Sequence, residues 1–93
     1  MLTLDTPIHI PASVAFSFVE QEAVLLNKQT NQYYRLDEVG ARLWGLLQDG
    51  KSLRKCHHLL LEEYDVNPAR LETDLLELVD DLLEHGLLEI VQP

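Results

Sequence analysis

Cys56, His57 and His58 are the residues whose types most clearly suggest chemistry, because a cysteine beside two histidines could bind a metal ion or act as a nucleophile. In a helix, however, consecutive side chains point about 100° apart, and helical ligand pairs are three or four residues apart. The remaining histidines, His9 and His85, are far away in the sequence. The triplet therefore predicts a buried Cys56 with histidines at the surface and no metal site.

Other catalytic patterns are also absent from the sequence. Nucleophilic catalysis by Cys56 would need an orienting acid at a recognisable spacing, and none is present. The four glycines are isolated, which excludes a phosphate-binding loop. A run of carboxylates follows the polar side of a predicted helix, so we interpret it as a solvated face. These residues are Glu72, Asp74, Glu77, Asp80, Asp81 and Glu84. We expect no enzyme, no cofactor and no metal.

The stretch QYYRLDEVGARLW, residues 32–44, organises the rest of the chain. Its first residues alternate, which places Tyr34 and Leu36 on one face of a strand and their neighbours on the other. At Asp37, a good N-cap residue, the apolar period changes to that of an amphipathic helix. A strand therefore leads directly into a helix.

Strand patterns precede this stretch and helix patterns follow it. We predict a single α+β domain over residues 1–93, with a winged helix-turn-helix-like fold in which a three-stranded antiparallel sheet is followed by three helices. Residues 1–13, with two prolines, form an arm or an edge strand. The expected strands are 14–19, 23–27 and 32–36, the helices are 37–49, 52–65 and 67–85, and residues 87–91 form a short strand or a packed tail.

Composition limits the functions that this chain can have. Its 93 residues are 46% hydrophobic and 25% charged, as in ordinary globular domains. There is no apolar run of the roughly 20 residues that a membrane span requires, and the first residues do not resemble a signal peptide. A single cysteine is typical of a reducing compartment, so we expect a cytoplasmic protein.

The net charge of −9 argues against a nucleic-acid partner. A winged helix-turn-helix normally suggests DNA, with its last helix in the major groove. Here that helix has one basic residue, Arg70, against the six acidic residues named above, and a duplex would repel it. A DNA-binding regulator is therefore the less favoured class.

The order and spacing of four segments resemble the PQQ-synthesis protein D family. The segments are VLLNKQTNQYYRLDEVGARLW, LL-x-DG-x-S at residues 46–52, EEYDVNPARLETDLLELVDDL and HGLL, and the resemblance covers residues 14–89. Members of this family are stand-alone recognition elements for ribosomally synthesised and post-translationally modified peptides. The chain is most similar to the small leader-binding B proteins of lasso-peptide clusters. It departs from the family pattern at Asn31, where glycine is frequent, and at Asp37, where asparagine is frequent.

This resemblance implies a non-catalytic protein that binds the leader of a precursor peptide and presents it to a separate enzyme. In the lasso branch that enzyme is a cysteine protease resembling transglutaminases, and an asparagine-synthetase-like cyclase follows it. An alternative partner is a radical-SAM maturase, as in PQQ synthesis. The leader is expected to add a strand to the open edge of the third strand, opposite the third helix. The expected leader-binding residues are Gln32, Tyr33, Tyr34, Arg35 and Leu36 of the strand, with Arg70, Leu71, Asp74, Leu75 and Leu78 of the helix.

Overall fold

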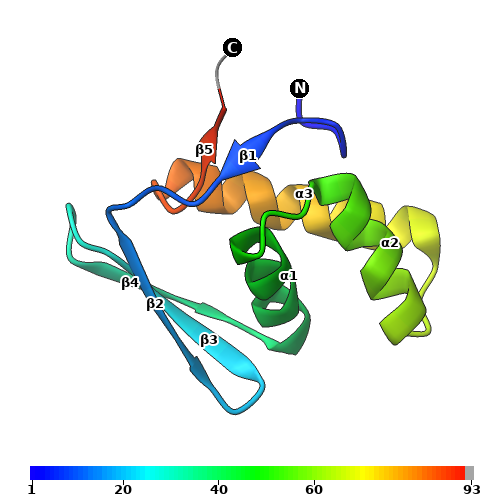
Figure 1. Ribbon diagram of the computed structural model, residues 1–93, viewed down its shortest axis with the longest axis horizontal. Helices are drawn as coiled ribbons and strands as arrows, with labels where there is room; N and C mark the ends of the chain where they lie inside the picture. Colours follow the sequence, from blue (N-terminus) through cyan, green and yellow to red (C-terminus); the bar gives the residue numbers. More distant parts are fainter. Residues whose placement is uncertain (92–93) are drawn as a thin grey trace.

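The computed structural model describes residues 1–91 and confirms the predicted α+β fold (Figure 1). Its strands are β1 (Ile8–His9), β2 (Val14–Val19), β3 (Glu22–Asn27), β4 (Gln32–Leu36) and β5 (Glu89–Ile90), and its helices are α1 (Glu38–Gln48), α2 (Leu53–Glu63) and α3 (Pro68–Glu84). The main sheet has the order β2-β3-β4, and neighbouring strands are antiparallel. None of the helices in the described part of the chain is long and apolar enough to cross a membrane.

The passage from β4 to α1 takes place at Asp37, as the sequence predicts. The carboxylate of Asp37 accepts a hydrogen bond from the Gly40 amide at 2.9 Å, which caps α1. A Cβ atom at Gly40 would lie 3.3 Å from Leu36, so glycine allows the first turn to pack closely on β4. At Gly45 the nearest atom to such a Cβ would be Cζ of Phe18, at an ordinary 3.8 Å, so no close backbone approach requires glycine there.

The ends of the other helices also follow the local sequence. Ser52 caps α2, and Asn67 caps α3 with Pro68 at the first helical position. Gly50 and Gly86 follow α1 and α3 with φ of +85° and +70°, a conformation that suits glycine.

The core lies between the main sheet and the three helices. Trp44 is fully buried at its centre and makes an edge-to-face contact with Phe16 of β2, with ring centroids 5.7 Å apart. Cys56 is also fully buried, as predicted. His58 is exposed and His57 is half-buried, with its Nε2 2.9 Å from the Pro68 carbonyl oxygen. Within residues 1–91, no group of three or more potential ligands could hold a metal ion.

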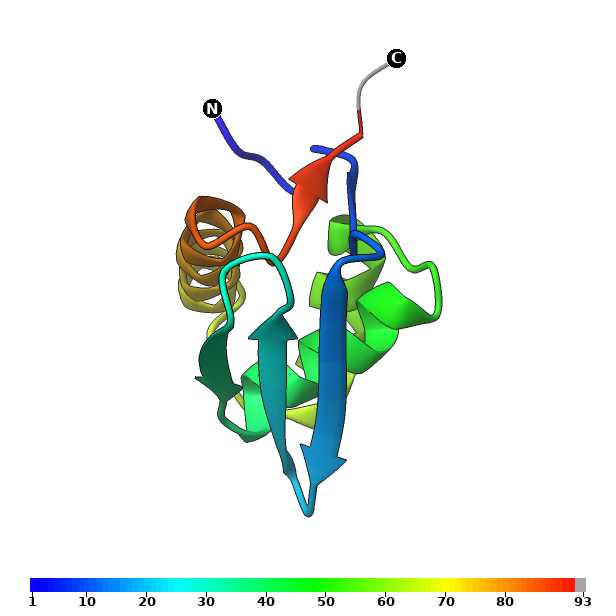
Figure 2. The same ribbon diagram turned by 90° about the vertical axis from the view of Figure 1, so that its left-hand side faces the viewer.

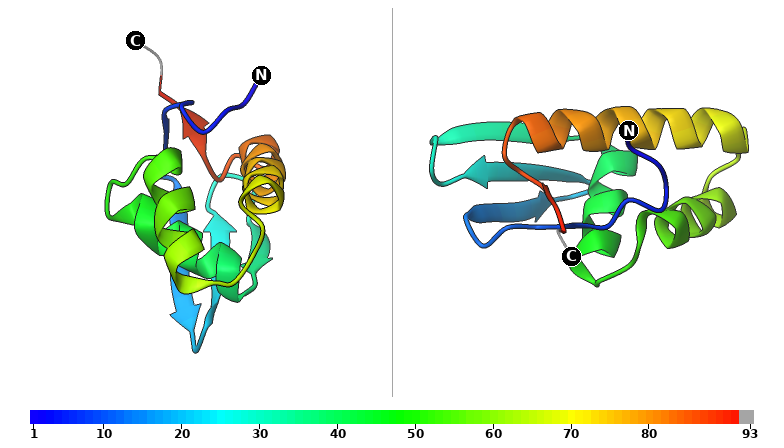
Figure 3. Two further views of the ribbon diagram at one scale, coloured as in Figure 1. Left: turned by 90° about the vertical axis from the view of Figure 1, so that its right-hand side faces the viewer. Right: turned by 90° about the horizontal axis from the view of Figure 1, so that it is seen from above.

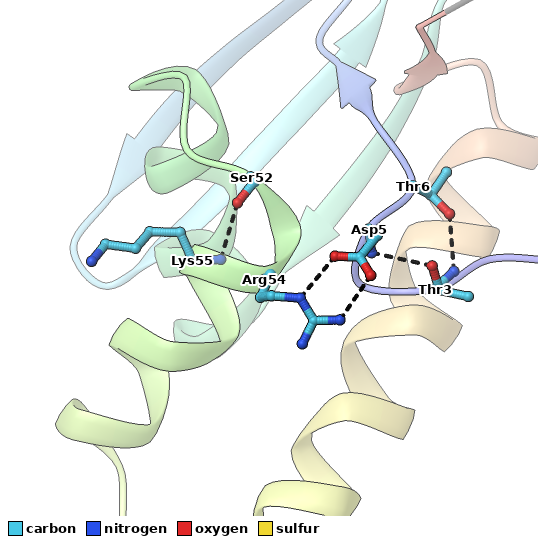
Figure 4. Close-up of polar contacts among 6 residues, drawn as sticks. All are labelled: Thr3, Asp5, Thr6, Ser52, Arg54 and Lys55. Atoms are coloured by element: carbon cyan, nitrogen blue, oxygen red, sulfur yellow. Dashed lines mark hydrogen bonds and ion pairs between the residues drawn. The ribbon is translucent and has the colours of Figure 1, made fainter.

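Two further contacts attach the N-terminal arm. Strand β1 pairs with β5, with Ile8 opposite Ile90, so the two ends of the chain lie side by side (Figure 1). Closer to the N-terminus, Arg54 of α2 donates two hydrogen bonds to Asp5, at 2.8 and 3.0 Å (Figure 4). These bonds lower the pKa of the Asp5 carboxyl, although both side chains are exposed. The arm up to His9 therefore packs with α2 and β5 and not at an edge of the main sheet.

The turn between β2 and β3 has a conformation that the sequence does not indicate. Val19 pairs with Glu22, which leaves a two-residue loop, and Glu20 has φ of +59°. Two-residue hairpins favour glycine at such positions. Phe18, next to this turn, is 48% exposed. Figure 2 shows that this end of the hairpin extends below the helices.

We expect Glu20→Gly to stabilise the fold, because the left-handed conformation is costly for a residue with a Cβ atom. The expected gain in the free energy of unfolding is about 0.5–1 kcal/mol. Gln21→Gly is the matched control, because Gln21 lies in the same turn without a positive φ. A glycine at position 21 increases only the conformational entropy of the unfolded chain, so Gln21→Gly should lower the free energy of unfolding. Urea denaturation measures both, and equal effects of the two substitutions would contradict the analysis.

We expect Cys56 to resist alkylation in the folded protein. Burial raises the pKa of its thiol to about 11, so the reactive thiolate is scarce at neutral pH, and the sulfur is shielded as well. Mass spectrometry after iodoacetamide treatment should show an unmodified native protein and a fully modified protein in urea. Rapid, complete labelling of the native protein would disprove the prediction.

A groove between β4 and α3

Strand β4 is an edge strand, because β3 is its only neighbour in the described sheet. Figure 2 shows β4 at the outer side of the sheet, with α3 seen end-on beside it. The right panel of Figure 3 shows α3 running along one side of the molecule, with α1 and α2 on its inner side. The predicted open edge is therefore present and lies next to the last helix.

The pairing of the hairpins shows which groups of β4 face this open edge. Val19 and Glu22 flank the two-residue β2–β3 turn, and the Lys28 amide donates to the Ser13 carbonyl. The backbone amides and carbonyls of every second residue of β3 therefore point toward β2. The remaining residues of β3, including Leu25, then bond to β4, where Leu25 faces Tyr34. By the same alternation, the amides and carbonyls of Tyr33 and Arg35 point to the open edge.

A cavity of about 810 Å³ lies between β4, the start of α1 and α3. We call it the β4–α3 groove. Its volume is within the range of roughly 300–1,000 Å³ that is usual for ligand sites. Its lining residues come from four parts of the chain: β4 (Tyr34, Arg35 and Leu36), the start of α1 (Asp37, Val39 and Gly40), the loop before α3 (Val66), and α3 itself (Leu71, Asp74, Leu75, Glu77, Leu78, Asp80, Asp81 and Glu84).

The groove brings together seven of the ten residues predicted to bind a leader: Tyr34, Arg35, Leu36, Leu71, Asp74, Leu75 and Leu78. The other three, Gln32, Tyr33 and Arg70, do not line it. The Tyr33 side chain is 71% exposed because alternation turns it to the opposite face of the sheet. The role of all ten residues in binding stays a prediction.

The apolar residues of the groove differ in how much surface they offer. Leu71 and Leu75 are 6% and 2% exposed, so they belong mainly to the core. Leu78 is half-buried, and so is Val39, which the sequence analysis did not include. Leu78 and Val39 therefore offer more accessible apolar surface to a ligand than the two buried leucines.

Tyr34 joins the two walls of the groove. Its hydroxyl donates a hydrogen bond to Asp81 of α3, and its ring contacts the His85 ring edge-on, with centroids 5.4 Å apart. The bond to the carboxylate, with burial and the charge of Asp81 adding, raises the pKa of Tyr34 to about 12. The strand and the C-terminal half of α3 are thereby held at a defined separation.

Asn27, the last residue of β3, attaches the C-terminal end of α3 to the sheet. It is the one buried polar side chain in the described residues, 5% exposed. Its Nδ2 donates to the His85 carbonyl at 2.9 Å, and its Oδ1 accepts from the Gln29 amide at 2.9 Å. A Cβ atom at Gly86 would lie 2.8 Å from Nδ2, so only glycine leaves room for this contact.

Four of the six carboxylates of α3 are exposed, as the interpretation as a solvated face predicts: Asp74, Glu77, Asp80 and Glu84. These four and Asp81 also line the groove, although only Asp74 was among the expected leader-binding residues. Glu72 alone lies outside it. The sequence pattern did show their spacing along one side of the helix, but it did not show that this side borders β4.

We expect stability to decrease with pH above 10 through Tyr34. The unfolded tyrosine loses its proton near its ordinary pKa of 10.0, whereas the folded one keeps it up to about pH 12. The folded state then binds more protons in this window, so the contribution is complete below pH 10 and is lost toward pH 12. Urea denaturation between pH 10 and 12 should show that the free energy of unfolding falls more steeply for the parent than for Tyr34→Phe. Equal slopes for the two proteins would contradict the role given to Tyr34.

Comparisons with known proteins agree with this geometry. Residues 22–88 match the family model described as "Coenzyme PQQ synthesis protein D (PqqD)". A solved structure of "TbiB1 in Complex with the TbiA(beta) Leader Peptide" is similar with a TM-score of 0.86 and 34% identity, covering 91% of this chain and 99% of that one. A second, "Lasso peptide synthetase B1 complexed with the leader peptide", has a TM-score of 0.80 and 26% identity, covering 88% and 96%.

No curated protein sequence is significantly similar to this chain. The family match nevertheless spans most of the sequence, and it includes β3, β4 and the three helices. The chain therefore belongs to the PqqD family.

Proposed function

We propose that this protein binds the leader of a ribosomally synthesised precursor peptide as an added strand on β4 and presents it to a separate enzyme, without catalysing a reaction itself. The observation that carries the proposal is the open edge of β4 beside the groove, in a fold shared with two proteins solved with leader peptides. The similarity to the lasso peptide synthetase B1 structure supports the lasso-peptide class.

The edge and the groove have different roles in this binding. Each added backbone hydrogen bond is worth about 0.5–1.5 kcal/mol net and carries little sequence information. Tyr33 and Arg35 together offer two amides and two carbonyls to the leader backbone. Selectivity then depends on the side chains of the groove, chiefly the half-buried Leu78 and Val39. Of the other expected leader-binding residues, Gln32 contributes at the strand end and Arg70 at the start of α3.

The proposed partner enzyme is a cysteine protease of the transglutaminase-like type, acting before a cyclase. The match to the PqqD family supports a second candidate, in which the same fold serves a radical-SAM maturase. Co-purification with the enzymes encoded beside this gene distinguishes the two. A DNA-binding role is disfavoured, because α3 presents Arg70 against six carboxylates.

The groove can be tested with two leucines of α3. Leu78 lines the groove, whereas Leu76 is similarly half-buried on α3 but lies outside it. The probe is the fluorescein-labelled leader of the precursor encoded beside this gene, and the readout is fluorescence anisotropy. Leu78→Asp should weaken binding at least tenfold, because it places a charge against apolar anchors, and Leu76→Asp should change it little.

The edge can be tested by removing one amide. Tyr33→Pro deletes an outward amide and leaves the bonds to β3 intact, which edge strands tolerate. Tyr33→Ala keeps the amide and is the control. We expect the proline variant to bind several-fold more weakly than the alanine variant. If both this pair and the leucine pair bind like the parent, with folding verified by circular dichroism, the proposed binding mode is wrong.

A further inference from the structure

The lining of the β4–α3 groove has a strongly one-sided charge. It contains six carboxylates and one basic group, Arg35. The Arg35 guanidinium forms an ion pair with Glu22 of β3, so its charge is largely compensated outside the groove. A peptide strand on β4 would therefore lie beside a negative wall.

Three of these carboxylates already have partners within the protein. Asp37 caps α1, Asp74 lies 3.9 Å from Arg70, and Asp81 accepts the Tyr34 hydroxyl. The remaining three, Glu77, Asp80 and Glu84, form no ion pair and no side-chain hydrogen bond within residues 1–91, and all three are exposed. We call these three residues the acidic rim.

The acidic rim is long enough to accompany a bound strand. From Glu77 to Glu84 the helix advances by seven residues, or about 10 Å. An extended peptide covers this distance with about three residues, at about 3.3 Å each. Strand β4 has five residues, Gln32–Leu36, so the rim is as long as more than half of the strand. Side chains of an added strand that face the groove would contact its apolar residues, such as Leu78 and Val39, and their ends would lie close to the acidic rim.

We infer that the leader segment that pairs with β4 carries lysine or arginine beside its apolar anchors, and that the acidic rim selects for this positive charge. The inference rests on the proposed function and specifies the chemistry of its ligand. A long cationic side chain can cover apolar surface with its stem while its charged end meets a carboxylate. An acidic segment at the same place would be repelled by three uncompensated charges.

The competing explanation is that these carboxylates only add to the overall charge of −9. That charge attracts any cationic peptide weakly, from every side of the protein. A local role predicts that the position of a carboxylate matters, whereas a general role predicts that only the number of carboxylates matters. Two variants with the same net charge separate the two explanations.

The rim variant combines Glu77→Gln, Asp80→Asn and Glu84→Gln, and the control variant combines Glu20→Gln, Glu62→Gln and Asp65→Asn. Each set removes three negative charges, and the control residues lie outside the groove. The probe is the labelled leader of the neighbouring precursor, in its own sequence and with its lysines and arginines replaced by glutamine. Anisotropy titrations at low and high salt give the dissociation constants.

We expect the rim variant to bind the leader roughly tenfold more weakly at low salt, and the control variant less than about twofold more weakly. The difference should shrink at high salt and disappear with the glutamine-substituted leader. Equal weakening by both variants, or a rim effect that persists with the neutral leader, would overturn the inference. If the parent does not bind the leader at all, the proposed function itself fails.

Discussion

The position of α3 relative to β4 depends on the side-chain amide of Asn27. This buried group joins the carbonyl of His85, the residue that follows α3, to the β3–β4 hairpin, and Tyr34 adds a second attachment one turn earlier, at Asp81. The N-terminal part of α3 packs against α2 and carries the buried Leu71 and Leu75. Because the helix is held at both ends, the space between it and the strand remains open as a groove.

A groove with fixed walls lowers the cost of binding a flexible peptide. The protein has little to reorganise, so the free energy of the new contacts is opposed mainly by the ordering of the peptide. The direct passage from β4 to α1 contributes to this rigidity, because the Asp37 cap and the close approach at Gly40 leave no loop between the elements. The β4–α3 groove is thus built mainly on a strand and two helices.

The features that could be predicted from the sequence are those determined by neighbouring residues. The caps at Asp37, Ser52 and Asn67 and the left-handed Asn31 follow from local chemistry. The contacts that shape the groove join residues 58 and 47 positions apart, Asn27 with His85 and Tyr34 with Asp81, and no local pattern reports them. The acidic side of α3 was visible as a pattern, but its place beside β4 required the tertiary structure.

The charged rim also has a consequence for the empty protein. An unpaired edge strand is a template for the same edge of another copy, and such pairing leads to aggregation. Two copies meeting through β4 would bring their rims of Glu77, Asp80 and Glu84 toward each other, with no cation between them. Repulsion between these identical surfaces should oppose such pairing, so the carboxylates that we infer to favour a cationic peptide should also disfavour self-association through β4.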